Sequence, residues 1–206
     1  VYIDSDLVMR THVARTVSRC FVVLRQLRSI RKSVPTSVFQ SLVVTLVLNR
    51  LDFGNAILTG LPAYLLRRLE SVLNASARLI FGLRRADHIT DALVNLHWLR
   101  VPERIKYKVA LLTYRALNGS APPYLADSLV RIADVPSCGR LRSSTSQALL
   151  IPAVRLSTVG SRAFPVAAPT QWNQLPVDVT SAASLSVFRR RLKTFLFRQS
   201  CPDIVV

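Results

Sequence analysis

Apolar residues recur at intervals of three and four along much of the chain up to about Gly119, a spacing typical of amphipathic helices. The pattern predicts a first helix from about Thr11 to Lys32, ended by Pro35. Its expected core face comprises Val13, Val17, Cys20, Leu24 and Leu27, widened by Phe21, Val23 and Ile30. Basic and polar residues occupy the rest of this helix, so one face should be buried and the other exposed.

Further helices are predicted in the same part of the chain. They are SVFQSLVVTLVLNRL, capped by Thr36 or Ser37, then about Ala63 to Leu83 after Pro62, a short helix from Asp91 to Leu96, and Pro102 to Gly119. The apolar run from Leu42 to Leu48 is far shorter than the roughly 20 apolar residues of a membrane span. The second helix is therefore expected to be a buried helix of a globular fold.

The pattern changes beyond the segment APPYL and the polar stretch from Ser137 to Ser146. ALLIPAVRLS has the composition of one or two short strands, as does VYID at residues 1–4. A final amphipathic helix, SLSVFRRRLKTFLF, should be capped by Ser184. Trp172 lies in an apolar, proline-framed segment that favours burial over base stacking.

These elements predict a mainly α fold: a helical bundle, then a short β segment and C-terminal amphipathic helices. The expected divisions are residues 1–4 as a terminal strand, 5–135 as the bundle and 136–206 as a β/α tail region.

Charge changes this picture, because 28 Lys and Arg stand against 11 Asp and Glu, a formal net charge of +17. Such an excess predicts attraction to polyanions, either nucleic acid or an anionic membrane surface. Arginine outnumbers lysine, and its planar guanidinium suits bidentate contact with phosphate. An arginine-biased genome is the alternative explanation, but an excess this large opposes compaction unless a partner offsets it.

Motifs for catalysis or metal binding are missing from the sequence. It has no GxGxxG, GxxxxGK[ST] or GxSxG, and its three cysteines show neither zinc nor disulfide spacing, so reduced thiols are expected. Asp4 and Asp6 form an Asp-x-Asp that could ligate Mg²⁺, but a helix-entry cap is the favoured interpretation. The chain is therefore expected to carry no active site and no cofactor of its own.

The basic residues of the first helix fall on both rims of its apolar stripe. On a helical wheel, Arg15 and Arg19 lie on one rim, and Arg25, Arg28 and Lys32 lie on the other. Solvated helices usually alternate charge signs, whereas only Asp4 and Asp6 oppose seven Arg and Lys among residues 1–35. The same imbalance recurs in two further clusters, Arg67, Arg68, Arg78, Arg84 and Arg85, and Arg189, Arg190, Arg191 and Lys193.

Seven segments follow one another in a specific order: YIDSDLVMRTHV, CFVVLRQLRSIRKSVP, LVLNRLDFGNAILTGLP, ARLIFGLRRADHITDAL, LHWLRVPERIKYKVALLTYRALNGSAPPYL, RAFPVAAPTQWNQLP and SLSVFRRRLKTFLF. In this order they resemble the C-terminal part of the reverse transcriptase of LINE-type, jockey-like non-LTR retrotransposons. The resemblance implies that Val1 to Asp4 is the tail of the polymerase palm and that the following helices form the thumb. The palm carboxylates that hold two Mg²⁺ in that family have no counterpart here, so catalysis is not carried over.

The resemblance implies a fragment that binds the backbone of an RNA/DNA template–primer without sequence preference. The partners expected are RNA, DNA and the missing palm, inside the cell in nucleus or cytoplasm. The fragment character also agrees with the absence of an initiator Met and of a signal peptide. The residues expected to contact phosphate are Arg15, Arg19, Arg25, Arg28, Arg31, Lys32, Arg67, Arg68, Arg84, Arg85, Arg189, Arg190, Arg191 and Lys193.

Two other functions remain open at this point. One is a helical protein-interaction module whose positive charge is incidental and whose apolar faces dock on a partner. The other, binding of the C-terminal helix to an anionic membrane, is weaker because its arginines occur without a second anchoring signal.

Overall fold

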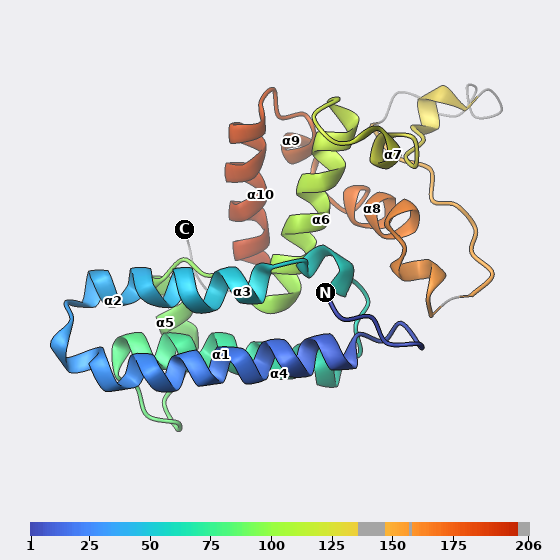
Figure 1. The fold of residues 1–206 in the computed structure, drawn as a ribbon. Coiled ribbons are helices and arrows are strands. Elements are labelled where there is room, and N and C mark those ends of the chain that lie inside the picture. Colours follow the sequence, from blue (N-terminus) through green and yellow to red (C-terminus); the bar gives the residue numbers. More distant parts are fainter. Residues whose placement is uncertain (136–146, 157, 202–206) are drawn as a thin grey trace. The chain divides into compact units, whose positions relative to one another are not determined.

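The computed structural model describes residues 1–135, 147–156 and 158–201, and it is mainly helical (Figure 1). The prediction of a mainly α fold is thus confirmed. The predicted strands are wrong: within the described residues, strand pairing is limited to one isolated bridge between Arg131 and Leu149. VYID finds no partner strand, and its Val1 and Ile3 side chains are 59% and 70% exposed. A segment with the composition of a strand forms one only if its backbone N–H and C=O groups bond to a neighbouring strand.

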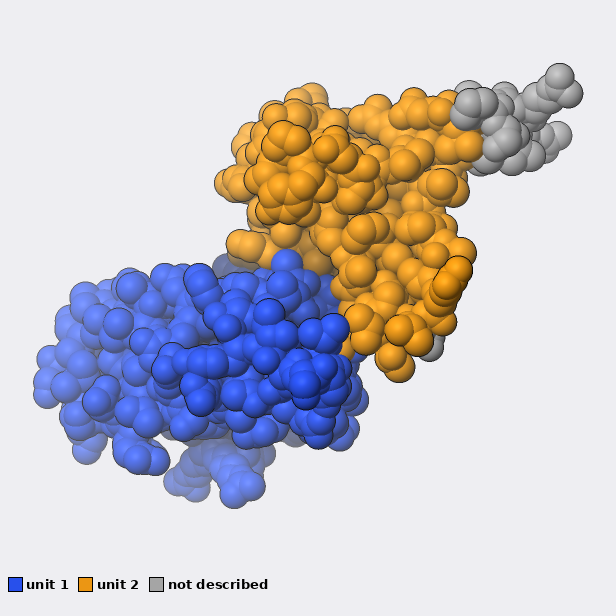
Figure 2. Space-filling model, turned by 45° about the vertical axis from the view of Figure 1, so that its right-hand side comes forward, with its two compact units in different colours: residues 1–104, 197–206 blue, residues 105–196 orange. Residues whose placement is uncertain are grey.

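The chain divides into two compact units, residues 1–104 with 197–206 and residues 105–196 (Figure 2). The helices of the first unit are α1 (Arg10–Ile30), α2 (Thr36–Val43), α3 (Asn49–Asp52), α4 (Ala63–Phe81) and α5 (Thr90–Asn95). Those of the second are α7 (Pro123–Ala126), α8 (Phe164–Trp172) and α9 (Val177–Thr180). α6 (Val101–Leu117) and α10 (Leu185–Ser200) each contribute residues to both units. The division expected at residue 136 lies inside the second unit, and the polar stretch that prompted it, Ser137 to Ser146, lies outside the described residues.

The first unit is built around α1, which packs against α4 and against the helical stretch that follows it. The five stripe residues predicted for its core are all buried: Val13, Val17, Cys20, Leu24 and Leu27. The predicted widening of the stripe is wrong for Phe21 and Ile30, which are 37% and 39% exposed. Burial raises the pKa of the Cys20 thiol to about 11, so this cysteine is protonated and unreactive at neutral pH. Cys20 and Cys201 are free, and Cys138 lies outside the described residues.

The second predicted helix is one continuous helical stretch, in which a π-helical segment, Val44–Leu48, joins α2 to α3. Its predicted cap is wrong, because Thr36 is the first helical residue and Pro35 occupies the cap position without a side-chain hydrogen bond. The fixed φ of proline already suits this position, so the helix begins without a polar cap.

α4 runs beside α1 and ends where Gly82 adopts a left-handed conformation, with φ 68°. The N–H of Leu83 then bonds to the carbonyl of Arg78 at 3.0 Å, which closes the last turn in the manner of a glycine-terminated helix. The face of α4 turned inward includes Leu65, Leu69, Val72, Leu73, Ser76, Ala77 and Ile80, all buried.

An aromatic cluster forms the centre of the second unit. The Phe188 ring stacks on Tyr114 at 4.2 Å and on Trp172 at 5.9 Å between centroids. Trp172 is buried, as predicted, and its indole N–H donates to the carbonyl of Gln147 at 3.1 Å. The predicted cap of α10 is also confirmed, because the Ser184 hydroxyl accepts the N–H of Val187 at 3.3 Å.

Within the described residues, no helix combines the length and the apolar content that a membrane crossing requires. This agrees with the expectation from the short apolar run of the second helix.

A half-buried carboxylate joins α4 to the start of α6. Glu70 accepts the N–H of Val101 at 2.9 Å, and burial raises its pKa above the usual carboxyl value. The folded protein therefore binds this proton more tightly than the unfolded chain. Stability should fall as pH rises through the interval between the ordinary carboxyl pKa and the raised one.

We expect Glu70→Gln to flatten this acidic-range pH dependence, because the amide oxygen still accepts from Val101 without a buried charge. Glu70→Ala should lower the free energy of unfolding by about 1–2 kcal/mol, because the Val101 N–H loses its acceptor. Urea unfolding across the acidic range measures both effects. A pH dependence in Glu70→Gln equal to that of the parent protein would contradict the assignment.

Candidate nucleic-acid interface

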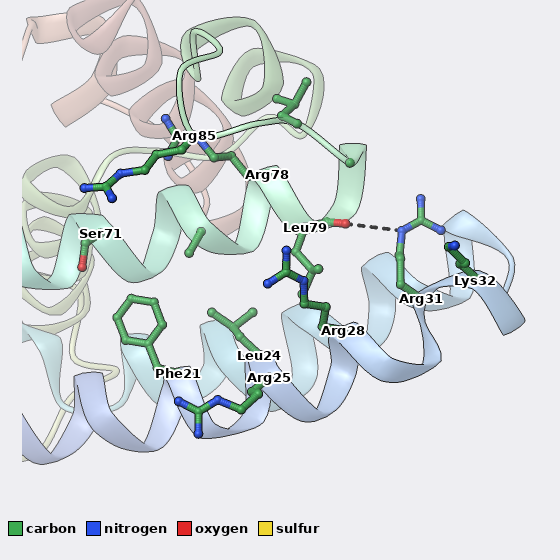
Figure 3. A pocket seen from close by; sticks show the side chains of 13 residues that line it. Phe21, Leu24, Arg25, Arg28, Arg31, Lys32, Ser71, Arg78, Leu79 and Arg85 are labelled. Atoms are coloured by element: carbon green, nitrogen blue, oxygen red, sulfur yellow. Dashed lines mark hydrogen bonds between the residues drawn. The ribbon is translucent and has the colours of Figure 1, made fainter.

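An open groove of about 950 Å³, here named the α1–α4 groove, lies between α1 and α4 (Figure 3). The residues that line it are Phe21, Leu24, Arg25, Arg28, Arg31, Lys32, Ser71, Ala75, Arg78, Leu79, Gly82, Leu83 and Arg85. Its lining combines apolar side chains with long basic ones.

Six of the lining residues are cations, and none carries a carboxylate. None of the six forms an ion pair with a described residue, since the three ion pairs of the described chain join Arg10 to Asp6, Arg100 to Glu70 and Arg104 to Asp52. Three of the scarce acids, Asp6, Asp52 and Glu70, thus pair with arginines outside the groove. Like charges gathered in this way raise the local potential and favour an anionic ligand.

Four of these cations, Arg25, Arg28, Lys32 and Arg85, are exposed, and their side chains form no hydrogen bond with the described part of the chain. In Figure 3 the guanidinium of Arg28 points across toward α4, while that of Arg25 extends along α1 toward Phe21. Because their donors are not used by the protein, these four side chains are the best placed to contact phosphate.

Arg31 has a structural role that the sequence does not indicate. Its guanidinium donates to the carbonyls of Leu79 and Ile80, at 3.3 and 2.8 Å, and lies 5.0 Å above the centroid of the Phe39 ring. These carbonyls belong to the last turn of α4, where no helical N–H is available to them. Arg31 thus stabilises the end of α4 and links it to the end of α1, although it also lines the groove.

The α4 side of the groove carries Arg78 and Arg85. Arg85 is one of the predicted phosphate contacts, whereas the sequence indicates Arg78 only as part of the charge imbalance. Arg78 is half-buried, and its guanidinium donates to the carbonyl of Asp87 at 3.4 Å. Ser71, another lining residue, lies seven positions before Arg78, so both lie on one face of α4. This spacing is the sequence signal that could have identified Arg78 as a residue of the groove.

Arg15 and Arg19 line a different groove, of about 830 Å³, between the first half of α1 and the residues around α3. The Arg15 guanidinium lies 4.2 Å from the centroid of the Tyr2 ring, and Arg19 donates to the Tyr2 hydroxyl at 3.2 Å. Hydrogen bonding by Arg15, with the charge of Arg19, lowers the pKa of this phenol. Arg50 completes the positive lining and was not predicted. The two rims of the helical wheel thus correspond to two separate grooves.

The remaining candidates lie outside both grooves. Arg67, Arg68 and Arg84 are exposed residues of the first unit, and the backbone N–H of Arg84 bonds to the Asp87 carboxylate at 2.6 Å. The α10 cluster is exposed on the second unit, where Arg191 donates to the carbonyl of Asp178; its members are Arg189, Arg190, Arg191 and Lys193. The structure therefore brings together only part of the predicted set.

The acidic pair near the N-terminus serves the entry to α1, as favoured from the sequence. Asp4 accepts the N–H of Thr11 at 3.0 Å, and Asp6 accepts the N–H of Val8 at 3.1 Å and pairs with Arg10. Among the described residues, no group of three or more His, Cys, Asp or Glu side chains is placed to hold a metal ion.

Arg31 and Arg28 lie one helical turn apart, and only the side chain of Arg31 bonds to the rest of the described chain. Substituting each in turn therefore tests whether Arg31 stabilises the fold. We expect Arg31→Gln to lower the free energy of unfolding by about 1–2 kcal/mol, because the α4 carbonyls and the Phe39 ring lose a charged partner. Arg28→Gln removes the same charge without removing a described hydrogen bond and should leave stability within about 0.5 kcal/mol. Equal unfolding free energies for the two variants in denaturant titrations would contradict the structural role of Arg31.

Comparisons with protein-family models, with curated proteins and with solved structures each returned no match for this chain. Its function is therefore inferred from the chemistry of these grooves.

Proposed function

We propose that this chain binds RNA and DNA through their sugar–phosphate backbone, without sequence preference, as the thumb-like and non-catalytic part of a retrotransposon RNA-directed DNA polymerase. The observation that carries the proposal is the α1–α4 groove, where six cations gather without one carboxylate. Phosphate contacts of this kind position a nucleic acid and supply most of its non-specific affinity.

The composition of the groove favours phosphate over a single small anion. Five of its six cations are arginines, whose forked donors match the two free oxygens of a phosphodiester. Cations occur along α1 from Arg25 to Lys32, a distance of several phosphates rather than one. A polyanion lying along the groove would thus compensate several of these charges together.

Polymerisation is assigned to the missing palm, together with the Mg²⁺ expected there, and not to any residue of this chain. The ordered segments that resemble the thumb and C-terminal region of LINE-type reverse transcriptases support this division. The proposal places the protein inside the cell, in nucleus or cytoplasm, with the palm as its protein partner.

A second candidate function is docking on a protein partner, favoured by large apolar side chains exposed on the first unit. These include Val38, Leu46, Phe53, Ile57 and Tyr64, which are 41–65% exposed. Exposed apolar groups of this size often mark protein contacts. Under this alternative, the groove cations would be incidental to binding.

Replacing Arg25, Arg28 and Lys32 together with Gln separates the two functions. Affinity for an RNA–DNA hybrid should fall, and the slope of log affinity against log salt should become shallower by about 3 if each residue contacts one phosphate. Titrations by fluorescence anisotropy at several salt concentrations measure both quantities.

The matched control changes three exposed cations outside the predicted clusters, Lys108, Arg131 and Arg155, to Gln. This control removes the same net charge. It should reduce the affinity for the hybrid, and the slope of log affinity against log salt, much less than the groove variant does. Hybrid binding that is unchanged in the groove variant, or is independent of salt in the parent protein, would favour the protein-docking alternative.

The retrotransposon origin has a separate test that needs no protein. The resemblance implies that the catalytic motif of the palm, Tyr-x-Asp-Asp, lies upstream of this segment. Genomic DNA upstream of the codon for Val1 should therefore encode Tyr-x-Asp-Asp in the same frame, within about 100–200 residues. An upstream frame without this motif would contradict the assignment to a polymerase thumb, whatever the protein binds.

A further inference from the structure

The floor of the α1–α4 groove carries an exposed aromatic ring that backbone binding does not explain. Phe21 is 37% exposed, whereas Leu24, which follows it along the floor, is only 6% exposed. Leaving a phenyl ring in water forgoes the favourable free energy of burial, and a phosphate cannot recover it. A ligand that covers Phe21 must therefore present an apolar or aromatic surface beside its negative charges.

The surroundings of Phe21 supply both kinds of contact. In Figure 3 its ring projects from α1 into the space below Ser71 of α4, with Arg25 beside it and the Arg85 guanidinium on the α4 side. Leu79 of α4 extends the apolar lining toward the other end of the groove, where Arg28 and Lys32 lie (Figure 3). Aromatic rings on the floor of a basic groove are typical of proteins that bind single strands, whose unstacked bases are free to stack.

We propose that the α1–α4 groove binds a single-stranded segment of nucleic acid, with one base stacked on Phe21 and the flanking phosphates on Arg25, Arg28 and Arg85. This inference rests on the proposed function and specifies in addition that the nucleic acid in the groove is single-stranded. A duplex keeps its bases stacked inside the helix, so it offers Phe21 only sugar and phosphate. Because every base has an aromatic face, the contact selects no sequence.

An acidic amphipathic peptide would also combine negative charge with an apolar surface. Peptide helices usually anchor in a groove through several side chains spaced at i, i+3/i+4 and i+7. Among the large apolar residues that line this groove, only Phe21 is exposed, while Leu24 is buried and Leu79 and Leu83 are half-buried. One exposed ring among six cations suits a nucleic-acid strand, which presents a base between phosphates, better than a peptide helix, which needs several apolar pockets.

The test compares two chains of equal charge and length, an oligothymidylate of about ten nucleotides and an abasic deoxyribose-phosphate chain. The parent protein should bind the oligothymidylate more tightly than the abasic chain. Phe21→Leu should weaken the binding of the oligothymidylate on the order of tenfold and leave the affinity for the abasic chain unchanged. Phe21→Tyr keeps an aromatic face and should bind like the parent protein. Val22→Ala, at the neighbouring exposed position outside the groove, is the matched control and should change neither affinity.

Far-UV circular dichroism and urea unfolding establish that each variant retains the fold. Equal binding of the two chains by the parent protein would overturn the inference while leaving backbone binding intact. The inference would also be overturned if Phe21→Leu lowered the affinity for both chains equally. The same holds if Phe21→Leu lowered the affinity for an acidic peptide of equal charge as much as that for the oligothymidylate. Failure of both nucleic-acid chains to bind in a salt-dependent way would instead overturn the proposed function itself.

Discussion

Burial of one apolar stripe of α1 is the constraint on which the rest of the first unit depends. α4 lies on one side of this stripe and the stretch from α2 to α3 on the other, so α1 cannot rotate without exposing Val13, Cys20 and Leu24. Since side chains of a helix project at fixed angles, this packing also fixes where each arginine lies. The two grooves follow directly from it, one on each side of the buried stripe.

The distribution of acids shows how the fold tolerates so many positive charges. Asp4, Asp52 and Glu70 are used at structural positions: the entry to α1, the ion pair with Arg104 at 2.5 Å and the start of α6. The lining of the α1–α4 groove contains no carboxylate, so repulsion among its cations opposes the compact state. A ligand that binds only the folded protein would offset this repulsion and stabilise the fold by mass action. Binding and stability are therefore expected to be coupled in this unit.

The sequence allowed the helices up to Gly119, the last helix, the α1 core and the two basic rims to be predicted, because all of them depend on the 3.6-residue period. It did not indicate α7, α8 and α9, which are short or contain proline. It did not reveal the exposure of Phe21, since the width of the covered stripe depends on where α4 and α2 pack. The role of Arg31 was equally hidden, because its acceptors, Leu79 and Ile80, lie far away in sequence. The predicted strands failed for a related reason: VYID lacks a strand partner among the described residues, and ALLIPAVRLS pairs only through the isolated bridge from Leu149 to Arg131.

The contacts of Arg31 imply that the basic positions of α1 differ in the substitutions they tolerate. At positions 25, 28 and 32 the side chain makes no hydrogen bond within the described part of the chain, so exchange between arginine and lysine should leave the stability of the fold almost unchanged there. At position 31 one planar group reaches two carbonyls and covers an aromatic ring. The compact ammonium of lysine cannot reproduce that geometry. In related chains, arginine without lysine at this position would therefore reflect the architecture of the bundle rather than selection for ligand binding.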